Sequence, residues 1–193
     1  RKRSGRAIAG DGRLRDQLVA TLPYTLTQGQ RDVLDDIRGD MALPLRMLRL
    51  LQGDVGSGKT VVALLAMLAA VETGAQAAFM VPTEILARQH LATLTELCQD
   101  LDIRIAILTG RNKGRPRQAL LDDLVDGRID ILIGTHALFT EDVMFKDLAL
   151  IVIDEQHRFG VHQRLTLGDK GEAADILVMT ATPIPRTLSL TVY

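Results

Sequence analysis

The chain has 193 residues, enough for one domain with a sizeable hydrophobic core. A formal net charge of −1 and an aromatic content of 3% exclude a domain-wide cationic field and a large base-stacking platform, so contact with nucleic acid is expected to be local and mostly with phosphates. No apolar stretch is long enough to span a bilayer, and Cys98, the only cysteine, fits a reducing compartment, most simply as an apolar helix residue.

Residues 1–22 are rich in glycine and arginine, and they show only weak periodicity until Leu14–Leu22. This pattern is typical of a linker or a frayed basic extension, so residues 23–193 are expected to form the globular domain. A chain that opens on a run of charge also suggests a piece of a larger protein.

The first helix of the globular domain is predicted over Thr27–Asp40. Thr27 is a favourable N-cap residue, and Gln30 follows three positions later, as in a capping box. Leu34 and Ile37 belong to an apolar stripe on one side of this segment.

Beyond residue 46, short apolar runs alternate with helical segments. Buried strands are predicted over 47–51, 76–81, 103–108, 129–133, 148–153 and 175–179. Helices are predicted over 58–73, 83–100 and 115–126, with a shorter one after residue 158. This alternation predicts an α/β fold with a mostly parallel sheet and helices on both faces.

Ligands of such sheets collect at the carboxyl ends of the strands. Six loops are therefore expected on one rim of the sheet. They begin at Gly53, Pro82, Thr109, Gly134, Asp154 and Thr180.

The loop after the first predicted strand matches the phosphate-binding pattern GxxxxGK[ST]. It consists of Gly53, Asp54, Val55, Gly56, Ser57, Gly58, Lys59 and Thr60. Glycines allow backbone N–H groups to converge on phosphate, while Lys59 neutralises the β- and γ-phosphates and the Thr60 hydroxyl ligates Mg²⁺. A chance glycine-rich turn is the alternative, and the strand and helix expected on either side disfavour it.

A second chemical motif follows the apolar strand LALIVI. Asp154 is placed to hold the Mg²⁺ that accompanies the phosphates, and Glu155 to activate water as a general base. An aspartate that merely caps the next element is the alternative.

Three other groups allow two interpretations each. Thr180 and Thr182 either bond His157 and sense the γ-phosphate or cap the turn into Pro183–Arg186. His90 is most simply a surface or helix-packing residue. The third group is the basic loop, which either contacts phosphates or is only solvated; it carries Arg111, Lys113, Arg115 and Arg117.

The ordered strings Gln30, GDVGSGKT, PTEILARQH, TG, GTHAL, DEQH and TATPIPR resemble the motifs of superfamily-two helicases. The longer strings DEQHRFGVHQR, over Asp154–Arg164, and TATPIPRTL resemble those of the RecG family of bacterial ATP-dependent DNA helicases. The transcription-repair coupling factors share part of these strings and are the alternative. The resemblance runs from about Leu22 to the last residue.

This resemblance implies a RecA-like P-loop NTPase fold and specific residue roles. Gln30 would read the adenine edge, Tyr24 would stack on the base or belong to the core, and His157, Thr180 and Thr182 would couple nucleotide state to domain movement. Contact with the DNA backbone is implied for Pro82, Thr83, Thr109, Gly110, Gly134, Thr135 and His136. Lys113 and Arg115 are added to this set from their expected place on the rim.

The implied function is that of the ATP-binding half of a motor that remodels branched DNA, such as stalled forks and Holliday junctions, in the bacterial cytoplasm near the nucleoid. ATP and Mg²⁺ are the expected cofactors. Superfamily-two motors hydrolyse ATP between two RecA-like domains, and the second supplies an arginine finger. Neither that domain nor the upstream wedge domain has room in this chain, so the isolated piece is expected to be a very weak ATPase. A non-hydrolysing nucleotide-binding module and, last, a small-molecule kinase are the alternatives.

Overall fold

The computed structural model describes residues 4–54, 56–154 and 174–181. Its strands are β1 (Leu48–Gln52), β2 (Gln76–Met80), β3 (Ile105–Leu108), β4 (Ile131–Gly134), β5 (Leu148–Asp154) and β6 (Asp175–Thr180). Its helices are α1 (Arg13–Thr21), α2 (Gln28–Met41), α3 (Lys59–Glu72), α4 (Glu84–Leu97), α5 (Gly114–Val125) and the 3-10 helix η1 (His136–Phe139).

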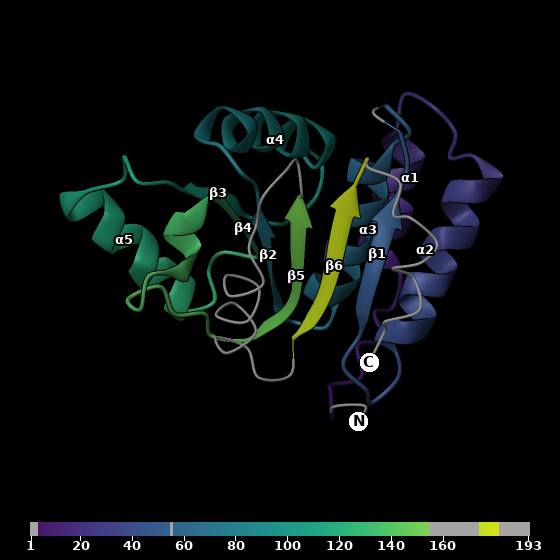
Figure 1. Ribbon diagram of the computed structural model, residues 1–193, viewed down its shortest axis with the longest axis horizontal. Coiled ribbons are helices and arrows are strands. Elements are labelled where there is room, and N and C mark those ends of the chain that lie inside the picture. Colours follow the sequence, from purple (N-terminus) through teal and green to yellow (C-terminus); the bar gives the residue numbers. More distant parts are fainter. Residues whose placement is uncertain (1–3, 55, 155–173, 182–193) are drawn as a thin grey trace.

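The strands form one six-stranded sheet in the order β1-β6-β5-β2-β4-β3, and every neighbouring pair is parallel (Figure 1). All seven residues of β5 and all six of β6 are buried, which explains why these segments read as continuous apolar runs. At the edge, β1 leaves Leu48 and Leu50 exposed.

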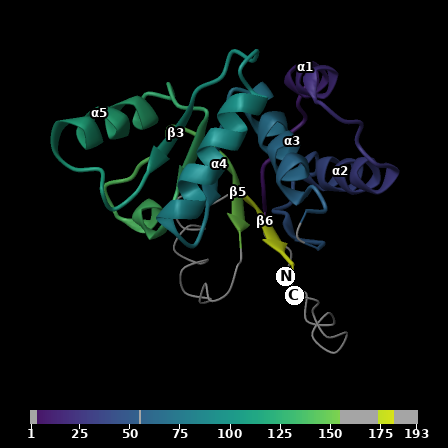
Figure 2. The ribbon, with the colours of Figure 1, turned by 90° about the horizontal axis from the view of Figure 1, so that it is seen from above.

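Helices cover both faces of the sheet. The core on one face draws its side chains from α1, α2, α3 and α4, whereas the core on the other draws them from α5 and η1. Seen from above, α1, α2 and α3 lie together at one side of the ribbon and α5 at the other (Figure 2). Every residue from 61 to 70 of α3 is buried, because the sheet lies on one side of this helix and α1 and α2 on the other. The α/β fold with helices on both faces is therefore confirmed.

The N-terminal segment differs from the expected linker or frayed extension. Residues 13–21 form α1, whose Leu14 and Leu18 are 2% and 0% exposed, and Ile8 is buried as well. Two leucines at i and i+4 suffice, since the helix buries only one stripe against the domain. Gly10 permits this packing: an added Cβ would lie 2.8 Å from the carbonyl oxygen of Ala69 on α3. Part of residues 1–22 is thus core.

A pair of carboxyl groups lies where this segment meets α3. Glu72 Oε2 is buried without a hydrogen-bond partner among the described residues. Burial, and after it the influence of the Asp11 carboxyl, raises the pKa of Glu72 to about 7. Folding therefore favours the protonated form of Glu72 at the place where the N-terminal segment packs on α3.

The helix predicted from Thr27 is confirmed, with its capping box. The Thr27 hydroxyl accepts from the Gln30 N–H at 3.1 Å, and the Thr27 N–H donates to Gln30 Oε1 at 2.9 Å. Cys98, which follows α4, is buried in the core, and burial raises the pKa of its thiol to about 11, so it is inert at neutral pH.

The carboxyl ends of the strands lie at one edge of the sheet, which is the upper edge in Figure 1. Gln52 is paired with Thr180, Asp154 with Met179, Met80 with Ile153 and Gly134, and Gly134 with Leu108. The six predicted loops therefore begin on a common rim.

Candidate nucleotide and nucleic-acid site

The strand order divides this rim into two parts. The phosphate-loop half consists of the ends of β1, β6 and β5, which lead into the loop at Gly53, Thr180 and Asp154. The basic half consists of the ends of β2, β4 and β3, which lead into the loops at Pro82, Gly134 and Thr109. The predicted nucleotide residues thus gather on one half and the predicted nucleic-acid residues on the other.

The phosphate loop connects β1 to the first turn of α3. Gly56 and Gly58 have φ angles of 83° and 82°, in the left-handed region that favours glycine. Gly58 is the N-cap of α3 and supplies no side chain to its first-turn N–H groups. A helix N-terminus of this kind is suited to an anion because its N–H groups and its dipole both attract negative charge.

The Lys59 side chain folds over its own loop. Its Nζ donates to the carbonyl oxygens of Gly53 and Asp54, the second at 2.8 Å. The ammonium therefore lies at the loop, as its predicted role requires. Thr60, the predicted metal ligand, follows it in the first turn of α3.

Gln30 connects α2 to the same loop. Its Nε2 donates to the carbonyl of Ser57 at 2.9 Å, and a Cβ added at Gly58 would lie 2.1 Å from that nitrogen. The contact places Gln30 at the nucleotide site, although its role at the adenine edge stays a prediction. Tyr24 is 49% exposed, so of its two interpretations the core one is wrong.

Asp154, at the end of β5, is the predicted metal residue. It is buried, and its Oδ2 lies 3.2 Å from Nε2 of His90 on α4. Thr180 ends the neighbouring strand, and its carbonyl accepts from the N–H of Gly53 at 3.2 Å. The first phosphate-loop residue, Thr180 and Asp154 thus follow one another along the rim.

The oxygens of Thr60 and Asp154, next to a loop suited to phosphate, are of the kind that Mg²⁺ prefers. No group of three or more His, Cys, Asp or Glu side chains in the described residues could hold a metal ion unaided. The candidates Val55, Glu155, His157 and Thr182, and the helix predicted after residue 158, lie outside the described residues.

His90 is the site residue that reasoning from sequence assigned elsewhere, as a surface or packing residue. The available signal was its position seven residues after Thr83, which caps the helix at the rim by accepting from the Leu86 N–H at 3.2 Å. Two helical turns later, a side chain on the same side of the helix lies beside the ends of the neighbouring strands.

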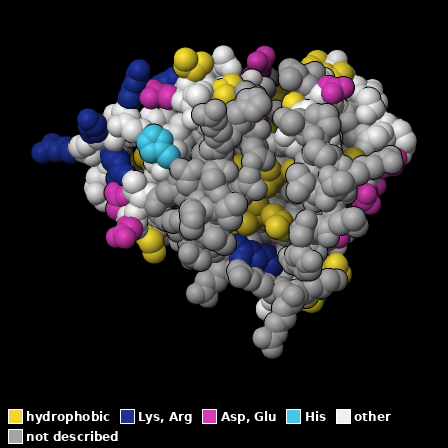
Figure 3. All heavy atoms as spheres, in the orientation of Figure 1, with side chains coloured by type: hydrophobic (Ala, Val, Ile, Leu, Met, Phe, Trp, Pro, Cys, Tyr) yellow, Lys and Arg dark blue, Asp and Glu magenta, His cyan; other side chains and the backbone are white. Residues whose placement is uncertain are grey.

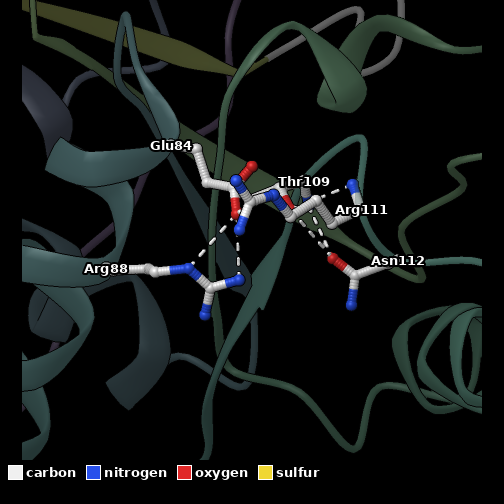
Figure 4. Close-up of polar contacts among 5 residues, drawn as sticks. All are labelled: Glu84, Arg88, Thr109, Arg111 and Asn112. Carbon is white, nitrogen blue, oxygen red and sulfur yellow. Dashed lines mark hydrogen bonds and ion pairs between the residues drawn. The ribbon is translucent and has the colours of Figure 1, made fainter.

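On the basic half, the loop after β3 is held by internal hydrogen bonds (Figure 4). The Thr109 N–H donates to Asn112 Oδ1 at 2.8 Å, and the Thr109 hydroxyl accepts from the Arg111 N–H at 3.3 Å. Thr109 is only 2% exposed, so its side chain shapes the loop and is not presented at the surface. Gly110 is exposed, and an added Cβ there would meet no atom within 4 Å.

Of the four residues predicted as a basic loop, Arg111 and Lys113 precede α5, whereas Arg115 and Arg117 belong to its first turn. Two of the four side chains are paired with carboxylates. Arg111 lies 3.3 Å from Glu84 Oε1, which also accepts from Arg88 at 3.0 Å (Figure 4). Arg117 bonds Asp142 through two nitrogens, and this guanidinium, with the Thr140 hydroxyl, lowers the pKa of Asp142 to about 2.

Lys113 and Arg115 are exposed, and no ion pair recorded among the described residues involves either of them. Space-filling Figure 3 shows Lys and Arg side chains gathered at the end of the molecule that carries α5, with acidic side chains between them. On the face drawn, positive and negative side chains are thus mixed at this end of the molecule.

The third loop of the basic half begins at Gly134, where packing demands glycine. A Cβ there would lie 2.6 Å from the carbonyl oxygen of Leu108 and 2.7 Å from the Leu138 side chain. Thr135 is buried, whereas His136 is exposed. Of this segment, His136 is the side chain available to a ligand. On the loop after β2, Thr83 is exposed and Pro82 half-buried.

A phosphate loop and a strand-end aspartate on a parallel sheet are typical of P-loop nucleotide-binding proteins. The DEAD/DEAH box helicase family matches residues 21–191, and the chain belongs to that family. Within it, the chain is 55% identical over 177 residues to the ATP-dependent DNA helicase RecG of Bacillus subtilis, which covers 92% of this chain and 26% of that protein. It is 52% identical over 184 residues to RecG of Haemophilus influenzae, and that match covers 93% of this chain and 27% of that protein.

Solved structures agree. A structure of RecG bound to a three-way DNA junction superposes with a TM-score of 0.87 at 47% identity, covering 98% of this chain and 25% of that one. The DUF1998 helicase MrfA superposes with a TM-score of 0.70 at 21% identity, which supports the fold alone. The resemblance to RecG inferred from the motif strings is confirmed, over about a quarter of the length of those relatives. No described helix has the length and apolar character needed to cross a membrane.

Proposed function

We propose that this chain is the ATP-binding first RecA-like domain of a DNA helicase that remodels branched DNA. The observation that carries the proposal is the row of phosphate loop, Thr180 and Asp154 along one half of the rim. The solved RecG structure with a three-way DNA junction supports a branched substrate, because this chain matches a quarter of that protein at 47% identity.

In the proposed site, the loop N–H groups and Lys59 bind the β- and γ-phosphates, while Thr60 and Asp154 hold Mg²⁺ directly or through water. The ion would neutralise charge that develops on the phosphates. Glu155 would orient and deprotonate the attacking water. His157, Thr180 and Thr182 would relay the nucleotide state to the rest of the motor, and Gln30 would recognise adenine.

The basic half would bind the DNA backbone without reading sequence, since hydroxyls, amides and cations all meet phosphates. Side chains suited to direct contact are those exposed on its loops: Thr83, Lys113, Arg115 and His136. Thr109 and Thr135, whose side chains are buried, would act by fixing the loops, together with Gly110, Gly134 and Pro82. The same protein would carry a second RecA-like domain and a wedge domain as partners of this one.

The proposal is tested by titrating Mg·ATP into the 193-residue chain by calorimetry. Lys59→Ala should weaken binding strongly because it removes the cation facing the phosphates. Lys113→Ala, which removes an equal charge from the basic half, should leave ATP affinity nearly unchanged. Equal loss in both variants, or no ATP binding by the wild-type chain at millimolar nucleotide, would contradict the assignment of the phosphate-loop half.

A further inference from the structure

The imidazole of His90 lies between a carboxylate and an aromatic ring. Its Nε2 is 3.2 Å from Oδ2 of Asp154, and the side chains of the pair are 15% and 10% exposed. Its ring centroid is 4.7 Å from that of the fully buried Phe79 on β2, at an interplanar angle of 54°. The ring contact and the hydrogen bond together fix the position of the imidazole.

The element order explains why this contact is possible. In the register, Phe79 is paired with Val152, so the side chains of Phe79, Val152 and, two residues later, Asp154 point to the same face of the sheet. That face is the one on which α4 packs. The other charged side chains early in α4 are engaged elsewhere, since Glu84 binds both Arg88 and Arg111.

The hydrogen bond occupies one oxygen of the carboxylate. Among the described residues, His90 is the recorded side-chain partner of Asp154, and it contacts Oδ2. A hydrogen on Nε2 would hold the carboxylate in one orientation and leave Oδ1 for the ligand. Groups that orient a metal-binding side chain in this way tune metal affinity, and their loss typically lowers it by roughly 10- to 100-fold.

We propose that His90 is a positioning residue for Asp154: it donates from Nε2 to Oδ2 and so orients the carboxylate toward the Mg²⁺ of the bound nucleotide. The inference rests on the proposed function, because it assumes that Asp154 serves the metal. It adds a residue of α4, the helix that begins on the basic half of the rim, to the nucleotide site.

Two variants separate positioning from packing. His90→Phe keeps a ring against Phe79 but removes the donor, whereas His90→Gln restores an N–H donor without the ring. The measurement is the gain in ATP affinity that Mg²⁺ provides, taken as the ratio of dissociation constants in EDTA and in excess Mg²⁺. We expect His90→Phe to reduce that gain by about tenfold and His90→Gln to recover most of it.

A second measurement uses the wild-type chain and needs no nucleotide. Long-range ¹H–¹⁵N spectra of the imidazole should show a hydrogen on Nε2 of His90, with a nitrogen shift that changes in Asp154→Asn. A His90 whose hydrogen is on Nδ1 alone would overturn the proposal even if both His90 variants failed to fold.

Asp154→Asn separates failure of this inference from failure of the proposed function. If Asp154→Asn abolishes the Mg²⁺-dependent gain and His90→Phe retains it, His90 is a packing residue and only the inference fails. The inference also fails if His90→Phe and His90→Gln reduce the gain equally, because the ring and not the donor then matters. If Asp154→Asn retains the full gain, Asp154 does not serve the metal and both proposals fail.

Discussion

The N–H of Gly53 donates to the carbonyl of Thr180 at 3.2 Å, and this bond joins the first residue of the phosphate loop to the last residue of β6. The position of the loop therefore depends on the strand end from which the chain continues toward Thr182. If Thr180 responds to the nucleotide as predicted, we expect a shift at the end of β6 to move the phosphate loop through this bond.

Binding and chemistry should be separable in the proposed site. Glu155→Gln should leave Mg·ATP affinity nearly intact, since it removes a base and no ligand, whereas Lys59→Ala should lose affinity. In a protein that carries both RecA-like halves, Glu155→Gln should abolish turnover. Calorimetric titration of both variants checks this, and an equal loss of affinity would show that Glu155 takes part in binding.

The isolated chain should hydrolyse ATP very slowly, with little stimulation by branched DNA. Asp54, Gly56 and Ser57 of the phosphate loop are exposed among the described residues, and an arginine finger supplied by a second domain is typically worth about 10³–10⁵ in rate. Steady-state phosphate release with and without a three-way junction is the measurement. Fast, DNA-stimulated turnover by these 193 residues would contradict the need for a second domain.

DNA binding by this chain should be weak, independent of sequence and sensitive to salt. Each phosphate contact contributes a slope of roughly −0.7 to −0.9 to log affinity against log salt. Lys113→Ala with Arg115→Ala should flatten that slope by about one contact each, because both side chains are exposed on the basic half.

The matched control for that pair is Arg104→Ala with Arg128→Ala. Arg104 and Arg128 both form ion pairs with Asp123, near the amino ends of β3 and β4 and so away from the rim. Replacing them removes the same formal charge as the Lys113 and Arg115 variant. Fluorescence anisotropy of a labelled oligonucleotide at several salt concentrations gives both slopes. Equal slopes in the two double variants would mean that the basic loop is only solvated.

The N-terminal segment should be needed for stability. Leu18→Ala removes a side chain with no exposed surface and should cost about 2–5 kcal/mol of unfolding free energy. Val19→Ala, on the exposed side of the same helix, should change stability by less than about 0.5 kcal/mol. Urea unfolding measures both. Similar, small effects would support the expected linker against the packed helix.

The contribution of Glu72 to the free energy of unfolding should fall as the pH rises from about 4.5 to about 7. Its pKa is raised from 4.5 to about 7 in the folded protein, so the folded state retains a proton that the unfolded chain releases in that window. Glu72→Gln keeps a hydrogen-bond donor at every pH, and it should flatten this dependence and be more stable than the wild type above pH 7. Urea unfolding between pH 5 and 8 tests it, with Glu96→Gln on α4 as the control; parallel profiles for the wild type and Glu72→Gln would contradict the raised pKa of Glu72.

Local patterns predicted most elements of the fold. Continuous apolar runs located β5 and β6, because strands covered on both faces are apolar at nearly every position between their ends. Thr27 and Gln30 located the start of α2, since a capping box is a local contact. The helix α1 was missed because its two buried leucines form too short a stripe to stand out within a glycine- and arginine-rich segment.

The site was predictable only as far as motifs reach. The glycine pattern and the strand-end aspartate identified the phosphate-loop half, because their chemistry needs fixed spacing. The contact of His90 with Asp154 depends on which strand lies beside which, and spacing along the chain does not contain that information. For the same reason, the carboxylates that pair Arg111 and Arg117 were not foreseen, and the four basic residues seemed equivalent.

The order of the strands also bears on how the molecule tolerates change. With neighbouring strands about 4.8 Å apart, five strand spacings put the ends of β1 and β3 about 24 Å from each other. Substitutions that far apart usually act additively, so, in the proposed function, we expect affinity for DNA and affinity for ATP to be adjustable independently of each other. The exception is α4, which starts among the basic loops and contacts Asp154 through His90. We expect epistasis between the two halves in double variants that include a residue of this helix.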